Sequence, residues 1–231
     1  MKSNGWPKLL KALIFDLDGT ITELSLPLEA MRQDTKTYFV ERGFPAESLE
    51  PADGISSSTA KAKEYFLSLG LSQREWEQME SEVDEMLSRH EGFAAVNAAL
   101  IEGALEIVHK IRNLGVRTAI YTNNGRPSVD RIMQHIPLAD YFDVIQTRHE
   151  SPQPKPFPDG LWKLVSVLGV HPDETAYVGD ALIDATAAKR AGIEFWGVAT
   201  GETPSWVLKD AGASVVFESL DGILDEVLSR R

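Results

Sequence analysis

From Gly103 onward, short apolar runs alternate with stretches of helical periodicity along the chain. An apolar run bounded by turn residues predicts a buried strand, whereas apolar positions three or four residues apart predict an amphipathic helix. One further apolar run stands near the start of the chain. The predicted strands are 12–15, 116–121, 143–146, 175–178, 194–198 and 214–217, and the predicted helices are 104–114, 127–135, 159–168, one that ends near 192, and 220–228.

The segment 23–95 breaks this alternation, because it reads as consecutive helices with no strand between them. The first predicted helix spans about 25–43. The second spans about 56–70 and begins at Ser56–Thr59, which we interpret as ordinary capping residues, with an anion-binding helix N-terminus as the alternative. The third begins at the capping box Ser72–Glu75. An apolar stripe in the third helix predicts the core of a helical bundle. The stripe consists of Trp76, Met79, Val83, Met86 and Leu87.

Strands that alternate with helices imply right-handed crossovers and a parallel sheet with helices on both faces. The sequence therefore predicts an α/β protein with a doubly wound, Rossmann-like core and an inserted helical domain. The core is assigned to 1–22 and 96–231 and the insert to 23–95, with hinges near Thr22–Leu24 and Val96–Glu102.

Composition narrows the class of protein. With 231 residues, 43% of them hydrophobic, the chain can bury a sizeable core. It contains no cysteine, which excludes a disulfide framework and a thiolate metal site. No apolar stretch approaches the roughly 20 residues that a membrane span needs, and Met1–Pro7 leads into the first strand too quickly to hold a secretory signal. We expect a cytoplasmic protein.

The formal net charge of -12 and the pI of about 4.9 argue against a nucleic-acid-binding surface, which would be basic. The five histidines are scattered without the spacing of a zinc site. Oxygen ligands in the absence of thiolates suit magnesium. In so acidic a chain, an anionic ligand needs local attraction from a metal ion or a nearby cation.

Two carboxylates follow the first apolar run, in Phe15-Asp16-Leu17-Asp18-Gly19-Thr20. Strand side chains alternate with a period of two, so Asp16 and Asp18 begin on the same side where strand gives way to loop. Two acids directed at one point can bind a hard cation, or can divide nucleophilic and proton-transfer roles. The alternative interpretation is an ordinary strand that ends in an Asp-Gly turn.

Three further motifs follow in order, each at a strand or helix boundary. They are Thr122-Asn123 after strand 116–121, Lys155 in the proline-rich stretch ahead of helix 159–168, and Asp180 with Asp184 after strand 175–178. Each has a simpler interpretation: a strand-end threonine, a solvated surface lysine, and acids at a helix N-terminus. Because Asp16, Thr122 and Asp180 all fall at carboxyl ends of predicted strands, we expect them to meet at one edge of the sheet.

With these four motifs in this order, the chain resembles the haloacid dehalogenase superfamily of phosphotransferases. The resemblance covers nearly the whole chain outside 23–95, including Lys155-Pro156, Leu168-Gly169-Val170 and Tyr177-Val178-Gly179-Asp180. It implies that the helical insert is a cap that closes over the core and supplies substrate contacts. The nearest general likeness is to phosphoglycolate phosphatases and related small-metabolite phosphatases.

The resemblance implies a magnesium-dependent phosphatase that acts through an aspartyl-phosphate. Asp16 would attack phosphorus, while Asp18, with a raised pKa, would protonate the leaving group and later activate water. The implied metal ligands are Asp16, the backbone carbonyl of Asp18, Asp180, and Asp184 directly or through water. The implied phosphoryl-binding groups are Thr122, Asn123 and Lys155.

The same residues help to distinguish this function from the alternatives. Asp18 argues against the halide-cleaving and phosphonate-cleaving branches, which lack an acid at this position. A sugar phosphomutase is the nearest alternative, but such enzymes use a histidine soon after the first motif, and the first histidine here is His90. A catalytically silent binding or regulatory member would usually show a damaged motif, and none is damaged here. A two-component receiver domain is shorter, lacks a cap and orders its residues differently. The substrate and the oligomeric state stay open.

Overall fold

The computed structural model describes residues 9–230. The described chain divides into two compact units: one joins the segment that ends at Ser25 with the chain from Asn97 onward, and the other spans Leu26–Val96. The assignment of 23–95 to a cap domain stays a prediction. The N-terminal stretch Met1–Pro7, where the sequence argues against a secretory signal, lies outside the described residues.

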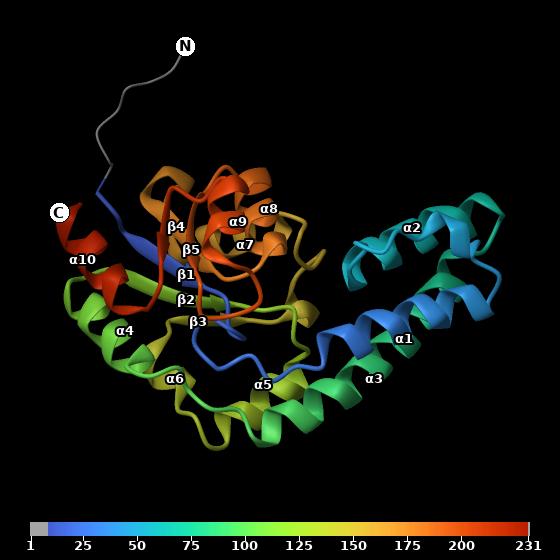
Figure 1. Ribbon diagram of the computed structural model, residues 1–231, viewed down its shortest axis with the longest axis horizontal. Helices are drawn as coiled ribbons and strands as arrows, with labels where there is room; N and C mark the ends of the chain where they lie inside the picture. Colours follow the sequence, from blue (N-terminus) through green and yellow to red (C-terminus); the bar gives the residue numbers. More distant parts are fainter. Residues whose placement is uncertain (1–8, 231) are drawn as a thin grey trace, which may run out of the picture. The chain divides into compact units, whose positions relative to one another are not determined.

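Six parallel strands form the sheet of the first unit, in the order β3-β2-β1-β4-β5-β6 (Figure 1). Their bounds are Ala12–Phe15 (β1), Arg117–Tyr121 (β2), Val144–Gln146 (β3), Thr175–Gly179 (β4), Glu194–Val198 (β5) and Val215–Phe217 (β6). From β1 the chain adds strands outward on one side and then returns to add strands on the other, which is the doubly wound arrangement. The predicted α/β class is confirmed, with strand bounds shifted by at most one residue.

Helices cover both faces of this sheet, with α7, α8 and α9 on one face and α4, α6 and α10 on the other (Figure 1). Their bounds are Ala104–Asn113 (α4), Arg126–Met133 (α5), Leu138–Tyr141 (α6), Asp159–Leu168 (α7), Leu182–Ala191 (α8), Ser205–Asp210 (α9) and Asp221–Ser229 (α10). The sequence missed α6 and α9 because helices of four and six residues are too short to show a periodicity.

β1 is the central strand of the sheet, because it pairs with β2 on one side and β4 on the other. All four of its side chains are buried. Burial of a large apolar side chain, such as Leu13, Ile14 or Phe15, stabilises the fold by about 1.5–3 kcal/mol. Phe15 pairs with Ile120 and with Val178. The residues just beyond these three positions therefore lie together at the carboxyl edge.

The unit Leu26–Val96 is all-helical, with helices at Leu28–Glu41 (α1), Ile55–Ser68 (α2) and Gln73–Val96 (α3). Its core is aromatic: Trp76 stacks on Phe39 with ring centroids 6.0 Å apart, and both rings are buried. The predicted stripe of α3 is confirmed, since Trp76, Val83 and Leu87 are buried in this core. Within residues 9–230, no helix combines the length and the apolar character needed to cross a membrane.

Of the two capping predictions in this unit, one is confirmed and one is wrong. The capping box at Ser72 is confirmed, since the Glu75 carboxylate accepts from the Ser72 backbone N–H at 2.8 Å and the Ser72 hydroxyl accepts from the Glu75 N–H at 3.3 Å. The capping role of Ser56–Thr59 is wrong. Gly54 is the N-cap of α2, and the Ser57 hydroxyl donates back to the Gly54 carbonyl at 3.1 Å instead of accepting a free N–H.

Candidate active site

Three of the predicted motifs, those of Asp16, Thr122 and Asp180, lie side by side at the carboxyl edge of the sheet. The Asp16 N–H donates to the Val178 carbonyl at 2.8 Å, which continues the β1–β4 ladder by one residue. Asp16 therefore stands beside the end of β4, where Asp180 follows Gly179. Thr122 follows β2 in the same way, with its N–H bonded to the Gln146 carbonyl at 3.1 Å. All three side chains are buried.

The loop after β1 turns tightly around Leu17. The carbonyl of Leu17 accepts from the N–H groups of Ile21 and Thr22 at 2.8 and 2.9 Å, and Gly19 adopts a φ of +79° that only glycine tolerates easily. Asp18 lies in this turn. Its Oδ2 accepts a hydrogen bond of 2.7 Å from the side-chain amide of Asn124, which links the loops after β1 and β2.

Lys155 is buried in the middle of the acids, with 1% of its surface exposed, so the surface-lysine interpretation is wrong. Its Nζ donates to Asp16 Oδ1 at 2.6 Å, to Asp184 Oδ1 at 2.8 Å and to the Tyr177 hydroxyl at 3.0 Å. An ammonium has three N–H donors, and each is matched here to one acceptor. Burial alone lowers the pKa of Lys155, but the two carboxylates more than offset this and raise it, so the side chain stays charged.

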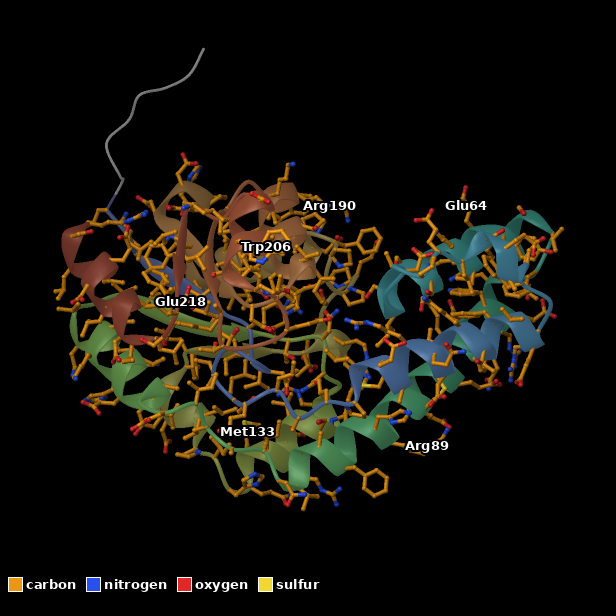
Figure 2. The ribbon with its side chains drawn as sticks, viewed as in Figure 1. Glu64, Arg89, Met133, Arg190, Trp206 and Glu218 are labelled. Carbon is orange, nitrogen blue, oxygen red and sulfur yellow. The ribbon has the colours of Figure 1, made fainter. Side chains whose placement is uncertain are left out.

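The loop that carries Lys155 is held on both sides. Asn123 makes a reciprocal pair with it: its Oδ1 accepts from the Lys155 N–H at 2.9 Å, and its Nδ2 donates to the Lys155 carbonyl at 3.0 Å. Arg190 on α8 (Figure 2) donates to the Pro156 carbonyl at 3.0 Å. Its guanidinium lies 5.5 Å from the Phe157 ring centroid. These contacts fix the ammonium at the carboxyl edge.

Asp180 is enclosed by two glycines and by the loop after β5. Its Oδ2 accepts from the Glu202 N–H at 2.6 Å, and its Oδ1 accepts from the Thr20 hydroxyl at 3.3 Å. A Cβ on Gly19 would stand 2.5 Å from Oδ2, and one on Gly201 would stand 2.0 Å from it. Both distances are impossible contacts, so both positions require glycine for Asp180 to stay where it is.

Asp184 lies in the first turn of α8, and protein donors engage both of its oxygens. Oδ1 accepts from Lys155 and, at 2.8 Å, from the Tyr177 hydroxyl, while Oδ2 accepts from the Ala181 N–H at 3.0 Å. Tyr177 is a buried member of β4 that the sequence analysis read only as part of an apolar strand. Burial first, and the Asp184 charge second, raise the pKa of its hydroxyl, so it stays protonated and donates to Asp184.

We call Asp16, Lys155, Tyr177, Asp180 and Asp184 the charged cluster. Oxygens of its three carboxylates lie within 4.8 Å of one another. Burial, opposed in part by Lys155 and reinforced by the neighbouring acids, raises the pKa of Asp16 well above its usual value, and burial and Asp184 raise the pKa of Asp180 to about 7. One ammonium does not balance three carboxylates. A hard divalent cation with oxygen ligands fits the excess negative charge, and Asp16, Asp180 and Asp184 could hold it.

The predicted site residues come together in this arrangement, although their roles stay predictions. Direct hydrogen bonds join Lys155 to Asp16, to Asp184 and to Asn123, and Asn124 links Asp18 to the loop of Thr122. Sequence reasoning missed three contributors: Tyr177, Asn124 and the loop of Gly201 and Glu202. Asn124 could have been suspected from the sequence, since it follows the candidate site residue Asn123. Its contact with Asp18 spans 106 residues of sequence and could not be read from one chain.

Comparison with known proteins identifies the family. Residues 13–198 match the family model described as haloacid dehalogenase-like hydrolase. Pyrophosphatase PpaX of Bacillus velezensis is 26% identical over 91% of this chain and 90% of its own length. Phosphoglycolate phosphatase of Thiobacillus denitrificans is 26% identical over 95% of this chain and 96% of its own length. A HAD family hydrolase from Deinococcus radiodurans R1, solved with bound phosphate and sodium, superposes with a TM-score of 0.61 at 20% identity, over 96% of each chain.

The family model covers well over half of the chain, and its span includes the charged cluster and Asp18. The curated relatives carry the names of phosphatases and a pyrophosphatase. The chain therefore belongs to the haloacid dehalogenase-like hydrolase family and is an enzyme of its phosphatase class.

Proposed function

We propose that this protein is a magnesium-dependent phosphatase that hydrolyses a small phosphorylated metabolite through a phosphorylated Asp16. The observation that carries the proposal is the buried contact of 2.6 Å between Lys155 Nζ and Asp16 Oδ1, set beside two further carboxylates at the carboxyl edge of the sheet. The names of the relatives support the reaction class. Because one is named for pyrophosphate and another for phosphoglycolate at the same 26% identity, the proposal stops at the class of substrate.

In the first step, the Asp16 carboxylate forms a bond to phosphorus while the bond to the leaving oxygen breaks. Asp18 gives its proton to that oxygen, so an alcohol leaves and the phosphoryl group stays on Asp16. In the second step, Asp18 takes a proton from water as the water oxygen attacks phosphorus. The bond to Asp16 breaks, and inorganic phosphate and free enzyme result.

The other residues stabilise charge and hold positions. Lys155 would bind a phosphoryl oxygen by turning one N–H away from its present acceptors, and the hydroxyl of Thr122 and the amide of Asn123 would bind the others. Phosphoryl transfer depends mainly on such positioning and on charge neutralisation. Magnesium, when bound by Asp16, the Asp18 carbonyl, Asp180 and Asp184, supplies further neutralisation of the phosphoryl charge. Three protein donors engage Asp184, two at Oδ1 and one at Oδ2, and it would help to hold the metal directly or through water.

The phosphomutase alternative receives no support from the histidines. His90, the first in the sequence, lies on α3, and its Nε2 is 2.7 Å from the Asp34 carboxylate within the helical unit. The evidence against a mutase is therefore the place of His90 in the sequence, far beyond the first motif, whereas the family's mutases carry their histidine soon after it.

The test is a screen of phosphorylated metabolites with p-nitrophenyl phosphate as a generic substrate, in the presence of EDTA and then of added magnesium. We expect EDTA to remove activity and magnesium to restore it. Full activity in a metal-free preparation would refute the metal dependence.

The intermediate is tested with Asp18→Asn and p-nitrophenyl phosphate. This substrate has a good leaving group and needs little help from an acid, so the first step continues while activation of water fails. We expect acid-quenched Asp18→Asn to carry one phosphoryl group on the peptide that contains Asp16, measured by mass spectrometry. Asp16→Asn treated in the same way is the control and should carry none. A phosphoryl group on any other residue would contradict the mechanism.

A further inference from the structure

Asn124 connects the proposed acid to the rest of the site. Its Nδ2 donates to Asp18 Oδ2 at 2.7 Å, and the residue is 4% exposed. A hydrogen bond to a charged group is among the stronger interactions of a side chain, and burial strengthens it further. None of the roles proposed for the four motifs uses this contact.

The backbone of Asn124 is fixed at both of its polar groups. Its N–H donates to the Thr122 hydroxyl oxygen at 3.0 Å, and its carbonyl accepts from the Arg148 N–H at 3.0 Å. The next residue, Gly125, is the N-cap of α5. The side-chain amide is therefore presented from a rigid turn at the end of β2.

A second buried amide in the same unit shows what a purely structural role looks like. Gln146, 3% exposed at the end of β3, donates from Nε2 to the Gly160 carbonyl at 3.0 Å. Its partner is backbone, and its loss would affect packing and stability alone. The partner of Asn124 is the carboxylate that moves protons in the proposed reaction.

We propose that Asn124 is a positioning residue for Asp18, an inference that rests on the proposed phosphatase function. The amide N–H engages Oδ2, which favours Oδ2 as the carbonyl-type oxygen of the protonated acid. The proton to be transferred is then carried on Oδ1. Asn124 thus fixes both the orientation of the carboxyl group and the oxygen that delivers the proton.

The consequence is a dependence on the leaving group. Phenolate is a far more basic leaving group than p-nitrophenolate, so departure of phenolate needs a well-placed acid and departure of p-nitrophenolate does not. Phenyl phosphate and p-nitrophenyl phosphate have the same charge and almost the same shape. The measurement is kcat/KM for both substrates, since this constant reports the steps up to departure of the leaving group and not the later attack of water.

For Asn124→Ala, we expect kcat/KM for phenyl phosphate to fall about tenfold more than kcat/KM for p-nitrophenyl phosphate. This is less than the 10²–10⁴-fold contribution of a general acid, because Asp18 itself stays in place and loses only its orientation. Asn124→Leu, which keeps the bulk and removes the donor, should behave in the same way. Gln146→Leu is the matched control: it removes a buried amide donor as well, and it should change both substrates by the same factor.

Equal losses on both substrates for Asn124→Ala and Asn124→Leu would overturn the inference and leave a structural role. If these variants do not fold, Asn124→Ser, which keeps a shorter hydroxyl donor, must show the same selective loss to a smaller degree, and equal losses in it overturn the inference too. A wild-type enzyme that hydrolyses neither substrate would remove the proposed function itself, which is a different result from equal losses in an active enzyme.

Discussion

Two buried regions of this chain, the core of the helical unit and the carboxyl edge of the sheet, differ in the chemistry of their side chains. The core of the helical unit is built from rings and aliphatic side chains around Phe39 and Trp76. The carboxyl edge of the sheet buries Lys155 and three carboxylates. Burial first, and the neighbouring acids second, raise the pKa values of Asp16 and Asp180 against the opposing charge of Lys155. Apolar burial stabilises a fold, whereas buried charges stabilise it weakly at best. The charged cluster is therefore placed for chemistry, and the aromatic core for stability.

The largest effect of this division is expected at Asp16. Asp16→Asn removes the nucleophile and one negative charge, and its amide oxygen can still accept from Lys155. We expect turnover to fall by at least about a thousandfold while the melting temperature stays equal or rises, because a buried like charge is removed. Steady-state kinetics with p-nitrophenyl phosphate and thermal denaturation check both parts. Wild-type-like turnover in the purified variant would end the proposed mechanism.

In the helical unit we expect a substitution to lower stability, whereas Asp16→Asn lowers turnover. Trp76→Ala empties a fully buried site next to Phe39, which costs about 3–5 kcal/mol for a large aromatic residue. We expect the peptides of α1, α2 and α3 to lose hydrogen-exchange protection, as measured by mass spectrometry.

Trp206→Ala is the control for this variant. Trp206 lies on α9 (Figure 2) and is 68% exposed, so its replacement should leave hydrogen exchange almost unchanged. Similar losses of protection in the two variants would show that the aromatic core does not carry the stability of the helical unit.

A smaller effect is expected at Tyr177, inside the charged cluster. Tyr177→Phe removes one acceptor of the Lys155 ammonium and one donor to Asp184 without changing the ring. The Lys155 ammonium beside Asp16 is then held less firmly, and because catalysis depends on its position we expect kcat/KM to fall about tenfold. Tyr121→Phe is the control, because its hydroxyl contacts Ser151 and the Gln153 carbonyl instead. Equal activity of the two variants would contradict a role for the Tyr177 hydroxyl.

The two regions were also predictable to different degrees. The strands and the stripe of α3 follow from hydrophobic periodicity, which is a local property of the sequence, and the carboxyl ends of parallel strands placed Asp16, Thr122 and Asp180 at one edge. The register could not be read from the sequence, and it is the register that brings Phe15 beside Ile120 and Val178.

Contacts between distant segments were the part that sequence reasoning could not supply. Lys155 meets Asp16 across 139 residues, and Asn124 meets Asp18 across 106. Tyr177 reads as one more apolar strand residue until its hydroxyl is seen against Asp184. The error at Ser56–Thr59 has a local cause, because Gly54 takes the extended N-cap conformation and moves the start of α2 ahead of the serines.

The smallest effect is expected at Glu150, a partly buried carboxylate that lies outside both the charged cluster and the aromatic core. Glu150 accepts from Arg126 Nε and NH2 at 2.9 Å each, and from the Thr147 N–H at 2.7 Å. Partial burial alone raises its pKa, but the Arg126 and Thr147 hydrogen bonds outweigh this and lower the pKa to about 2 from an ordinary value of 4.5. A lowered pKa contributes stability above the unfolded-state pKa, and this contribution is lost as pH falls through the folded-state pKa.

Glu150→Gln should therefore lower the free energy of unfolding at pH 7 by about 1 kcal/mol, a figure reduced for solvent screening because the side chain is partly exposed. The deficit should shrink as pH falls from about 4.5 toward 2, since the wild-type carboxylate becomes protonated over that range. Urea unfolding at pH 7, 4 and 3 measures it. Glu106→Gln, which removes an exposed partner of Lys110, is the control and should show a much smaller deficit. A deficit for Glu150→Gln that stays constant between pH 7 and pH 3 would mean that the Glu150 charge contributes nothing to stability.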